Sequence, residues 1–198
     1  MPREAPRILG IAGSLRRDSF NGRLLSYAVS QLPTQVEYRR YTELKSVAPF
    51  DEDDEATPPG SVERLRAQLH WADGLIIATP EYNAAIPGQL KNALDWASRP
   101  FDTASLRDVT AMVIGASTSS FGAVWAQAQL RAALGAAGAR VLDLEFAVSE
   151  AHERFTRDGR LADGDLAKQL ADLLAAFMNE VTVTATARTQ RNFIEEVS

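Results

Sequence analysis

The sequence contains no cysteine in its 198 residues. It therefore has no disulfide framework, no thiolate nucleophile and no Cys-X-X-Cys redox pair. If the protein carries out redox chemistry, a bound group must carry the electrons. Histidine is almost as scarce. His70 and His152 are isolated residues without a carboxylate cluster at ligand spacing, so we expect no metal site.

Long apolar runs and clustered positive charge are also missing. The longest apolar runs, at residues 74–78 and 109–116, are far shorter than the ~20 residues that a membrane-spanning helix needs. The first seven residues lack the apolar core of a signal peptide, so we expect a cytoplasmic protein with no membrane partner. A net charge of −5 without clusters of lysine and arginine argues against a nucleic-acid partner, so any phosphate contact must be local.

Two common nucleotide-binding motifs are absent. No Gly-Lys-Ser/Thr follows Gly10 or Gly13, which excludes a Walker P-loop and argues against hydrolysis of nucleoside triphosphates. The Gly-X-Gly-X-X-Gly fingerprint of dinucleotide-binding domains is missing as well. A nucleotide-like ligand must therefore be held by other loop chemistry.

What the sequence does contain is a regular alternation of two kinds of segment. Apolar runs of strand length occur at residues 8–12, 36–41, 74–79, 109–115 and 140–144. Segments with helical spacing occur at residues 21–31, 61–72, 87–98, 122–137 and 162–181. This alternation predicts an α/β fold with a five-stranded parallel sheet. The third run is apolar almost throughout, so we expect it at the centre of the sheet.

The length and composition fit one globular domain, which we place at residues 1–181. Residues 182–198 are polar, charged and β-branched without a core pattern, and we expect this tail to fray or to pack on a neighbouring subunit. An acidic stretch at residues 51–55 is followed by Pro-Pro-Gly at 58–60, which predicts a solvated loop. Substrate gating or a subunit contact is the alternative role of this loop.

The loop after the first strand, residues 13–21, has the chemistry of a phosphate cradle. It leads into a helix, so free N–H groups and the positive end of the helix dipole face a ligand above the strand. Ser14, Ser19 and Asn21 add short polar side chains, and Arg16 adds a planar guanidinium that suits phosphate oxygens. Taken alone, the loop is equally compatible with a plain turn and a capped helix.

The loop after the third strand suits a flat heteroaromatic ring. Pro80 fixes the backbone, Tyr82 offers an aromatic face, and Asn83 offers a donor and acceptors. We expect Glu81 to act through its backbone or in an interface, because its carboxylate would repel an anionic reduced ring. The alternative is a strand-end turn in which Tyr82 only packs. Because the carboxyl ends of neighbouring parallel strands form a ligand crevice, the two loops together predict a bound cofactor.

The loop after the fourth strand, residues 115–122, is rich in small residues that carry hydroxyl groups. These groups are candidates to bond the polar edge of the same ring. The segment is equally compatible with a flexible turn or a helix N-cap. It is therefore a third, less specific candidate for the site.

The conjunction of motifs resembles the NADPH-dependent FMN reductase family, which includes bacterial azoreductases and chromate and quinone reductases. The motifs are Gly-Ser-Leu-Arg-X-X-Ser-X-Asn at 13–21, Pro-Glu-Tyr-Asn at 80–83 and Pro-Gly-X-Leu-Lys-Asn-Ala-X-Asp-Trp at 87–96. The resemblance covers residues 7–177. It implies a flavodoxin-like three-layer α/β/α sandwich with sheet order 2-1-3-4-5 and FMN at the switch point.

The resemblance also implies site residues and an activity. The positions that match the phosphate-binding motif and its neighbour are Ser14, Arg16, Ser19, Phe20 and Asn21. The positions that match the ring-lining residues are Pro80, Glu81, Tyr82, Asn83 and Ser117. The implied reaction moves a hydride from NADPH or NADH to FMN and then electrons to a small molecule such as a quinone, azo compound, chromate or free flavin, in a ping-pong order. FMN carries the chemistry, so no side chain is assigned as catalytic.

Two features bear on substrate and assembly. Family members often have several glycines after the fourth strand, whereas this chain has Thr-Ser-Ser-Phe at 118–121 and then Trp125, which narrows the approach of nicotinamide or selects a flat aromatic acceptor. The helix at 87–98 has more apolar positions than one core-facing stripe requires, which suggests a second buried face. The resemblance implies that this helix and the next form a homodimer, with pairs of dimers as homotetramers. Packing within the monomer, with Trp96 as a core residue, is the alternative.

Two other functions remain open on the sequence alone. A flavodoxin-like electron carrier binds FMN but takes its electrons from a partner protein. Arg16 and the apolar helix at 87–98 favour the reductase, because carriers usually expose an acidic docking surface. A cofactor-free regulatory or interaction module, which keeps only the fold, is the third possibility.

Overall fold

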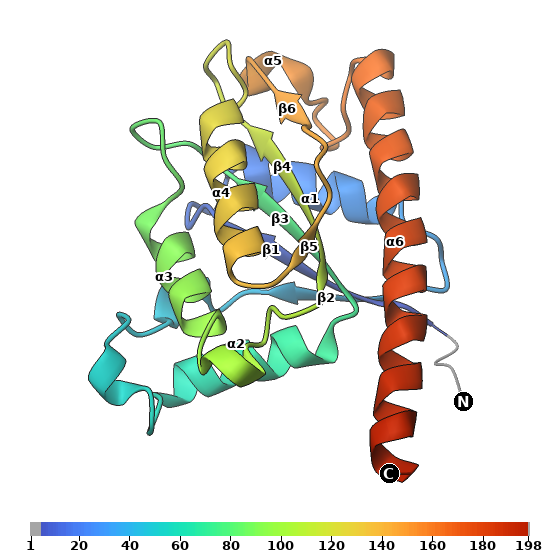
Figure 1. The fold of residues 1–198 in the computed structure, drawn as a ribbon. Helices are drawn as coiled ribbons and strands as arrows, with labels where there is room; N and C mark the ends of the chain where they lie inside the picture. The colour runs from blue at the N-terminus through green and yellow to red at the C-terminus, as the bar shows by residue number, and fades with distance from the viewer. Residues whose placement is uncertain (1–4, 198) are drawn as a thin grey trace.

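The computed structural model describes residues 5–197, with side chains through Thr186. The chain alternates strands and helices and forms three layers, with helices on both faces of one sheet (Figure 1). The strands are β1 (Arg7–Ala12), β2 (Glu37–Tyr41), β3 (Gly74–Thr79), β4 (Thr110–Ala116), β5 (Arg140–Val141) and β6 (Ala147–Val148). The helices are α1 (Phe20–Ser30), α2 (Gly60–Trp71), α3 (Gly88–Ala97), α4 (Val124–Ala136), α5 (Ala151–Arg154) and α6 (Gly164–Val197).

The sheet is parallel, and its main path runs β2-β1-β3-β4-β5. This order confirms the flavodoxin-like arrangement expected from the sequence. All residues of β3 and β4 are buried, as predicted for the third apolar run. The chain moves outward in one direction from β1 to β2 and then in the other direction through β3 and β4. The switch point, where open α/β sheets bind ligands, therefore lies between β1 and β3.

The fifth strand is shorter than predicted. The sequence predicts one strand at 140–144, whereas the structure has β5 and β6, which both pair with β4. Between them, the carboxylates of Asp143 and Glu145 lie 3.9 and 3.8 Å from the guanidinium of Arg131 on α4. Charged residues at a sheet edge interrupt the ladder and discourage pairing with another chain. The prediction of a continuous strand was wrong because it counted Leu144, which is 46% exposed, as part of the apolar run.

Strand residues alternate between two hydrophobic cores, one on each face of the sheet. Leu9 and Leu75 belong to the core that also contains residues of α2, α3 and α4. Ile8 and Ile76 belong to the core shared with α1 and α6. Because helices cover both faces, the central strands are apolar on both sides, and this is the pattern that made them recognisable in the sequence.

The last helix is longer than predicted. The sequence predicts a helix at 162–181, whereas α6 continues to Val197 and extends past the sheet (Figure 1). Thr184 is buried, and its hydroxyl oxygen lies 2.9 Å from that of Thr110 in β4. The hydroxyls of Thr182, Thr184 and Thr186 also donate to the carbonyls four residues earlier, so these polar β-branched residues are satisfied within a helix. Packing of this segment on a neighbouring subunit remains a prediction.

The second apolar face of α3 is covered by the same chain. Trp96 is fully buried, and its indole N–H donates to the carbonyl of Ala48 at 2.9 Å. The ring of Phe50 packs edge-on against the Trp96 ring, with 4.9 Å between centroids. Asn92 accepts the Phe50 N–H and donates to the Ala48 carbonyl. Packing within the monomer therefore explains these apolar residues. The acidic stretch after Phe50 forms a short exposed turn at Glu52–Asp54.

Trp96 in α3 and Trp125 in α4 give a matched test of the packing. Trp96→Ala is expected to lower the free energy of unfolding by roughly 3–5 kcal/mol, because it removes a fully buried ring and leaves a cavity. Trp125→Ala, at a side chain that is 47% exposed, is expected to change this free energy by less than about 1 kcal/mol. Urea unfolding followed by circular dichroism measures both variants. Equal losses in the two would contradict the packing described here.

Candidate functional site

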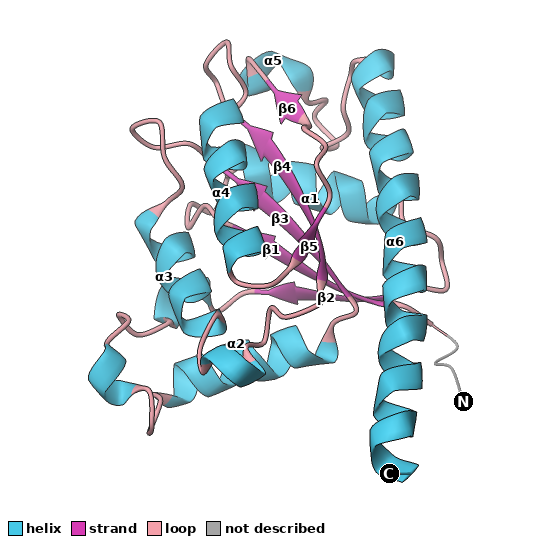
Figure 2. Ribbon diagram, in the orientation of Figure 1, coloured by secondary structure: helices cyan, strands magenta, loops and turns pink. Residues whose placement is uncertain are grey.

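The loops that follow β1, β3 and β4 leave the sheet at the same edge (Figure 2). Gly13 connects the first two, because its N–H donates to the carbonyl of Ala78 in β3 at 2.8 Å. A side chain at Gly13 would place its Cβ 2.9 Å from Leu90 of α3 and 3.2 Å from Pro80. Only glycine lets the first loop approach the second this closely. The structure thus brings together the loops from which the sequence predicted the site.

The first loop presents hydrogen-bond donors that the protein does not use. Ser19 is the N-cap of α1, and its hydroxyl oxygen accepts the N–H of Gly22 at 3.3 Å. Among residues 5–186, no protein group accepts the backbone N–H groups of Leu15, Arg17 and Asp18. These N–H groups and the positive end of the α1 dipole suit an anion.

Ser14 and Arg16 lie at the start of the same loop. The hydroxyl of Ser14 is 3.4 Å from the backbone N–H of Arg16. The Arg16 side chain is exposed, and no carboxylate of residues 5–186 lies within ion-pair distance of it. A guanidinium without an internal partner is available to a phosphate group, and the contact predicted from the sequence remains a prediction.

The structure uses Asn21 and Phe20 to hold the loop in place. The Asn21 amide donates to the carbonyl of Ala116 at 2.8 Å and accepts the Ala116 N–H at 2.9 Å, and the side chain is only 3% exposed. These paired bonds fix the start of α1 against the end of β4 and leave little of the amide for a ligand. The ring of Phe20 stacks on Phe155, with 6.0 Å between centroids. The Asn21 amide and the Phe20 ring are therefore both engaged by other parts of the protein.

The second loop makes a tight two-residue turn. The backbones of Tyr82 and Ala85 exchange hydrogen bonds of 3.0 and 3.1 Å, and the two residues between them, Asn83 and Ala84, have φ angles of +53° and +57°. Two successive left-handed residues define a type I′ turn, in which asparagine is favoured. The turn holds the Tyr82 side chain at the surface, where it is 50% exposed.

Glu81 connects the second loop to α4. Its carboxylate accepts the N–H of Ala126 at 3.0 Å, in the first turn of that helix. The N-cap position of α4 is occupied by Ala123, which has no side-chain acceptor, so Glu81 supplies the cap from another loop. A second bond, from the Gln129 amide to the carbonyl of Ala84 at 2.9 Å, adds to the connection. From the sequence we expected Glu81 to act through its backbone or in an interface, and we did not predict this cap. The available signal was that no capping residue precedes α4.

The third loop is held by β6 and by its own hydroxyl groups. The N–H of Ser117 donates to the carbonyl of Val148 at 3.0 Å, and its hydroxyl lies 3.0 Å from that of Ser119. Gly122 has a φ of +61°, and a Cβ at this position would lie 2.9 Å from the Cβ of Ala147. Glycine is therefore required where the loop turns towards α4. Ser117 remains at the sheet edge, in the position predicted for a ligand contact.

An exposed aromatic pair stands beside these loops. The rings of Phe121 and Trp125 are 4.9 Å apart between centroids, and the side chains are 57% and 47% exposed. Trp125 directly precedes Ala126, which Glu81 caps, so the pair adjoins the loop that carries Tyr82. The sequence pointed to both residues as bulky replacements for glycine, but it did not predict that they contact each other.

The match to known sequences decides between the interpretations that the sequence left open. Residues 6–153 match the family described as "NADPH-dependent FMN reductase". The chain belongs to this family. The assignment confirms the resemblance seen in the motifs. It makes the protein an FMN-dependent oxidoreductase that uses a nicotinamide co-substrate.

Individual proteins that resemble this chain agree with this assignment. The NAD(P)H-dependent FMN reductase PA1204 of Pseudomonas aeruginosa is 39% identical over 166 residues, which are 83% of this chain and 88% of that protein. A 2-hydroxy-1,4-benzoquinone reductase of Burkholderia sp. is 38% identical over 127 residues, 64% and 69% of the two chains. The solved structure of FerB, a flavoenzyme NAD(P)H:(acceptor) oxidoreductase of Paracoccus denitrificans, superposes with a TM-score of 0.83 at 31% identity and covers 91% of this chain and 99% of its own.

The described residues contain neither a membrane-spanning helix nor a cluster of metal-ligating side chains. No helix in the described part of the chain is long and apolar enough to cross a membrane. Within the same residues, no group of three or more histidine, aspartate or glutamate side chains is placed to hold a metal ion.

The Glu81 cap can be tested by its effect on stability. Glu81→Ala removes the only side-chain acceptor that the described residues offer to the first turn of α4, and we expect a loss of about 1 kcal/mol in the free energy of unfolding. Glu81→Gln keeps an acceptor oxygen and should lose less than half as much. Denaturant unfolding of the flavin-free protein measures both. An alanine variant as stable as the parent would show that the bond contributes nothing.

Proposed function

We propose that the protein transfers a hydride from NADPH or NADH to FMN and then electrons to a quinone or a similar flat acceptor. The observation that carries this proposal is that hydrogen bonds hold a phosphate cradle beside two other loops at the switch point: Gly13 bonds β3, which leads into the exposed aromatic turn, and Asn21 bonds the end of β4. A phosphate and a ring at the two ends of one ligand match FMN. This match supports the proposal that FMN binds at these loops.

The residues of the first loop fit the phosphate of FMN. Ser14, Arg16 and Ser19 supply two hydroxyl groups and a guanidinium, and the backbone N–H groups of Leu15 and Arg17 point to no internal acceptor. A phosphate monoester needs several donors and a positive field, which this loop and the α1 dipole provide together. We therefore assign the phosphate to this loop, with Asn21 and Phe20 in a supporting role.

The residues of the second and third loops fit the ring. Pro80 and the Tyr82 turn form one wall, with Asn83 at the tip of the turn, and Ser117 offers a hydroxyl for the polar edge. Bound FMN supplies a ring that accepts a hydride from the nicotinamide and returns two electrons to an acceptor. The protein holds donors where charge develops and leaves a face of the ring open. Because both substrates need that face, we propose a ping-pong order.

The loops around the ring favour an uncharged aromatic acceptor. Residues 117–123 carry no charge, and the single charged side chain of residues 80–87, Glu81, is engaged by α4. The exposed rings of Phe121 and Trp125 offer a stacking surface to a flat molecule. The relative from Burkholderia is named as a reductase of a benzoquinone. A quinone, an azo compound or free flavin therefore fits this entrance better than the chromate anion.

We also propose a homodimer that forms through α3 and α4, with pairs of dimers as a possible tetramer. The two helices border a groove of about 510 Å³, which is lined by Leu94, Ala133 and Ala136 among others. The Phe101 side chain at this groove is 65% exposed, as expected for an apolar contact residue. Sedimentation equilibrium tests the assembly, and a monomer at micromolar concentration would refute it.

The cytoplasmic location predicted from the sequence stays a prediction.

Loss of the phosphate contacts should weaken FMN binding strongly. For Ser14→Ala combined with Arg16→Ala we expect the dissociation constant of FMN to rise by at least about 100-fold, because two charge-assisted hydrogen bonds are removed. Arg64→Ala, on α2, removes the same charge away from the loops and serves as the control. Quenching of FMN fluorescence on titration measures all three proteins. Unchanged affinity in the double variant would remove the basis of the proposal.

The direction of electron flow separates the reductase from the electron carrier. Anaerobic mixing of the FMN-loaded protein with NADPH or NADH is expected to bleach the flavin absorbance at a rate that accounts for turnover. Addition of a benzoquinone should then restore the absorbance. A flavin that stays oxidised with both nicotinamides would favour a carrier that takes electrons from a partner protein. A colourless protein that FMN does not reconstitute would favour the cofactor-free module.

A further inference from the structure

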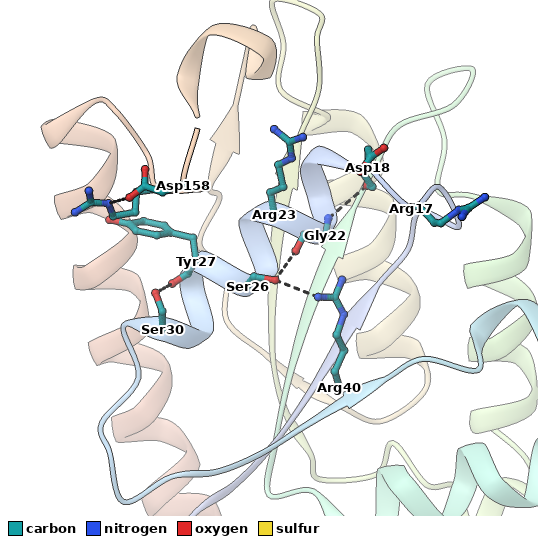
Figure 3. A pocket seen from close by; sticks show the side chains of 12 residues that line it. Arg17, Asp18, Gly22, Arg23, Ser26, Tyr27, Ser30, Arg40 and Asp158 are labelled. Atoms are coloured by element: carbon teal, nitrogen blue, oxygen red, sulfur yellow. Dashed lines mark hydrogen bonds and ion pairs between the residues drawn. The ribbon is translucent and has the colours of Figure 1, made fainter. Parts of the chain in front are cut away.

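A hollow of about 370 Å³ lies on the outer side of α1, at the end of the phosphate loop. Residues 17–19 of the loop, the first turns of α1, Arg40 of β2 and the turn at 158–160 line it (Figure 3). Its volume is in the range of small-molecule sites. The reaction described above gives this hollow no role.

Four arginines line this hollow, and only Arg160 among them lies within 4.0 Å of a carboxylate. For Arg17, Arg23 and Arg40, the described part of the chain offers no carboxylate at that distance. Of the two acids at the hollow, Asp158 is paired with Arg160, which leaves Asp18. In a protein with net charge −5, the hollow is thus locally positive.

The position of Arg40 is fixed by α1. Its guanidinium donates to the hydroxyl of Ser26 at 3.1 Å, and a Cβ added to Gly22 would lie 3.1 Å from the same group. Glycine at position 22 therefore leaves room for Arg40 to lie across the first turns of the helix. Figure 3 shows Arg23 and Arg40 on opposite sides of the stretch from Gly22 to Ser26. The two guanidinium groups frame the hollow.

A nicotinamide co-substrate brings anionic groups that need partners near the site. The second and third loops cannot provide them, because residues 80–87 contain only the acid Glu81 and residues 115–123 carry no charge. Arg16 is assigned to the FMN phosphate. Arg17, Arg23 and Arg40 line the hollow without a carboxylate partner among the described residues, and the first loop connects the hollow to the sheet edge at Gly13.

We propose that this hollow binds the adenosine 2′-phosphate of NADPH and makes the enzyme prefer NADPH to NADH. The inference rests on the proposed function, since it needs a nicotinamide that delivers its hydride at the sheet edge. NADPH differs from NADH by one phosphate monoester, which carries close to two negative charges at neutral pH. Arg23 and Arg40 hold that group, Arg17 lies towards the rest of the dinucleotide, and the half-buried ring of Tyr27 lines the same hollow. Planar guanidinium groups suit phosphate in this role better than ammonium groups.

The test compares a double variant with a charge-matched control. For Arg23→Ala combined with Arg40→Ala, we expect kcat/KM with NADPH to fall by roughly 10- to 100-fold, while kcat/KM with NADH changes little. Arg64→Ala combined with Arg140→Ala lowers the net charge equally on other surfaces and should leave the NADPH to NADH ratio as in the parent. Calorimetric titration of the FMN-loaded proteins with adenosine 2′,5′-bisphosphate gives a readout that needs no turnover. The double variant should bind it as weakly as the parent binds 5′-AMP.

Each other outcome overturns the inference in a recognisable way. If kcat/KM with NADPH falls equally in both double variants, the net charge of the protein selects the co-substrate and the hollow does not. If sodium phosphate displaces the bisphosphate from the parent at equal concentration, the hollow is an unselective anion surface. If FAD binds the parent more tightly than FMN and the Arg23 and Arg40 variant abolishes the difference, the occupant is the adenylate of a flavin. In all of these cases FMN reduction by either nicotinamide would still support the proposed function, and only a flavin that neither nicotinamide reduces would refute it.

Discussion

The paired hydrogen bonds between the Asn21 amide and the backbone of Ala116 are the interaction on which the site depends. They are buried, they satisfy both polar ends of one side chain, and they join the start of α1 to the end of β4 across β3. Because α1 follows the first loop and β4 leads into the serine-rich loop, this one side chain fixes the distance between the two loops. The family resemblance implies a phosphate contact for Asn21, and the structure shows that its amide also holds these loops together.

The other connections in the site serve the same purpose from different elements. Gly13 allows the first loop to approach β3, and Glu81 ties the second loop to the N-terminus of α4. A flavin enzyme needs little side-chain chemistry of its own, because the cofactor carries the electrons, but it needs a ring held at a fixed place with one face free. Loops that are bonded to each other and to rigid helices meet that need, while the aromatic side chains of Tyr82, Phe121 and Trp125 remain exposed to solvent.

Much of this arrangement could be predicted from the sequence. The parallel sheet and its central strand followed from apolar runs that are buried on both faces, and the loops of the site followed from their residue types at strand ends. What could not be predicted depended on contacts between distant segments. Residues 44–50 cover the second face of α3, the threonines after Val181 find carbonyl acceptors inside α6, and the edge strand breaks where Arg131 meets two carboxylates. Local pattern does not specify such partners, because each needs the tertiary fold to bring the second group into place.

We propose that the loop at the start of α1 binds the phosphate of FMN and so anchors the ring on the neighbouring turn. This can be measured by comparing the affinity of the flavin-free protein for FMN with its affinity for riboflavin, which has the same ring and no phosphate. We expect FMN to bind at least about 100-fold more tightly, since the charged hydrogen bonds of the loop are made only to the phosphate. Equal affinities for the two flavins would contradict it.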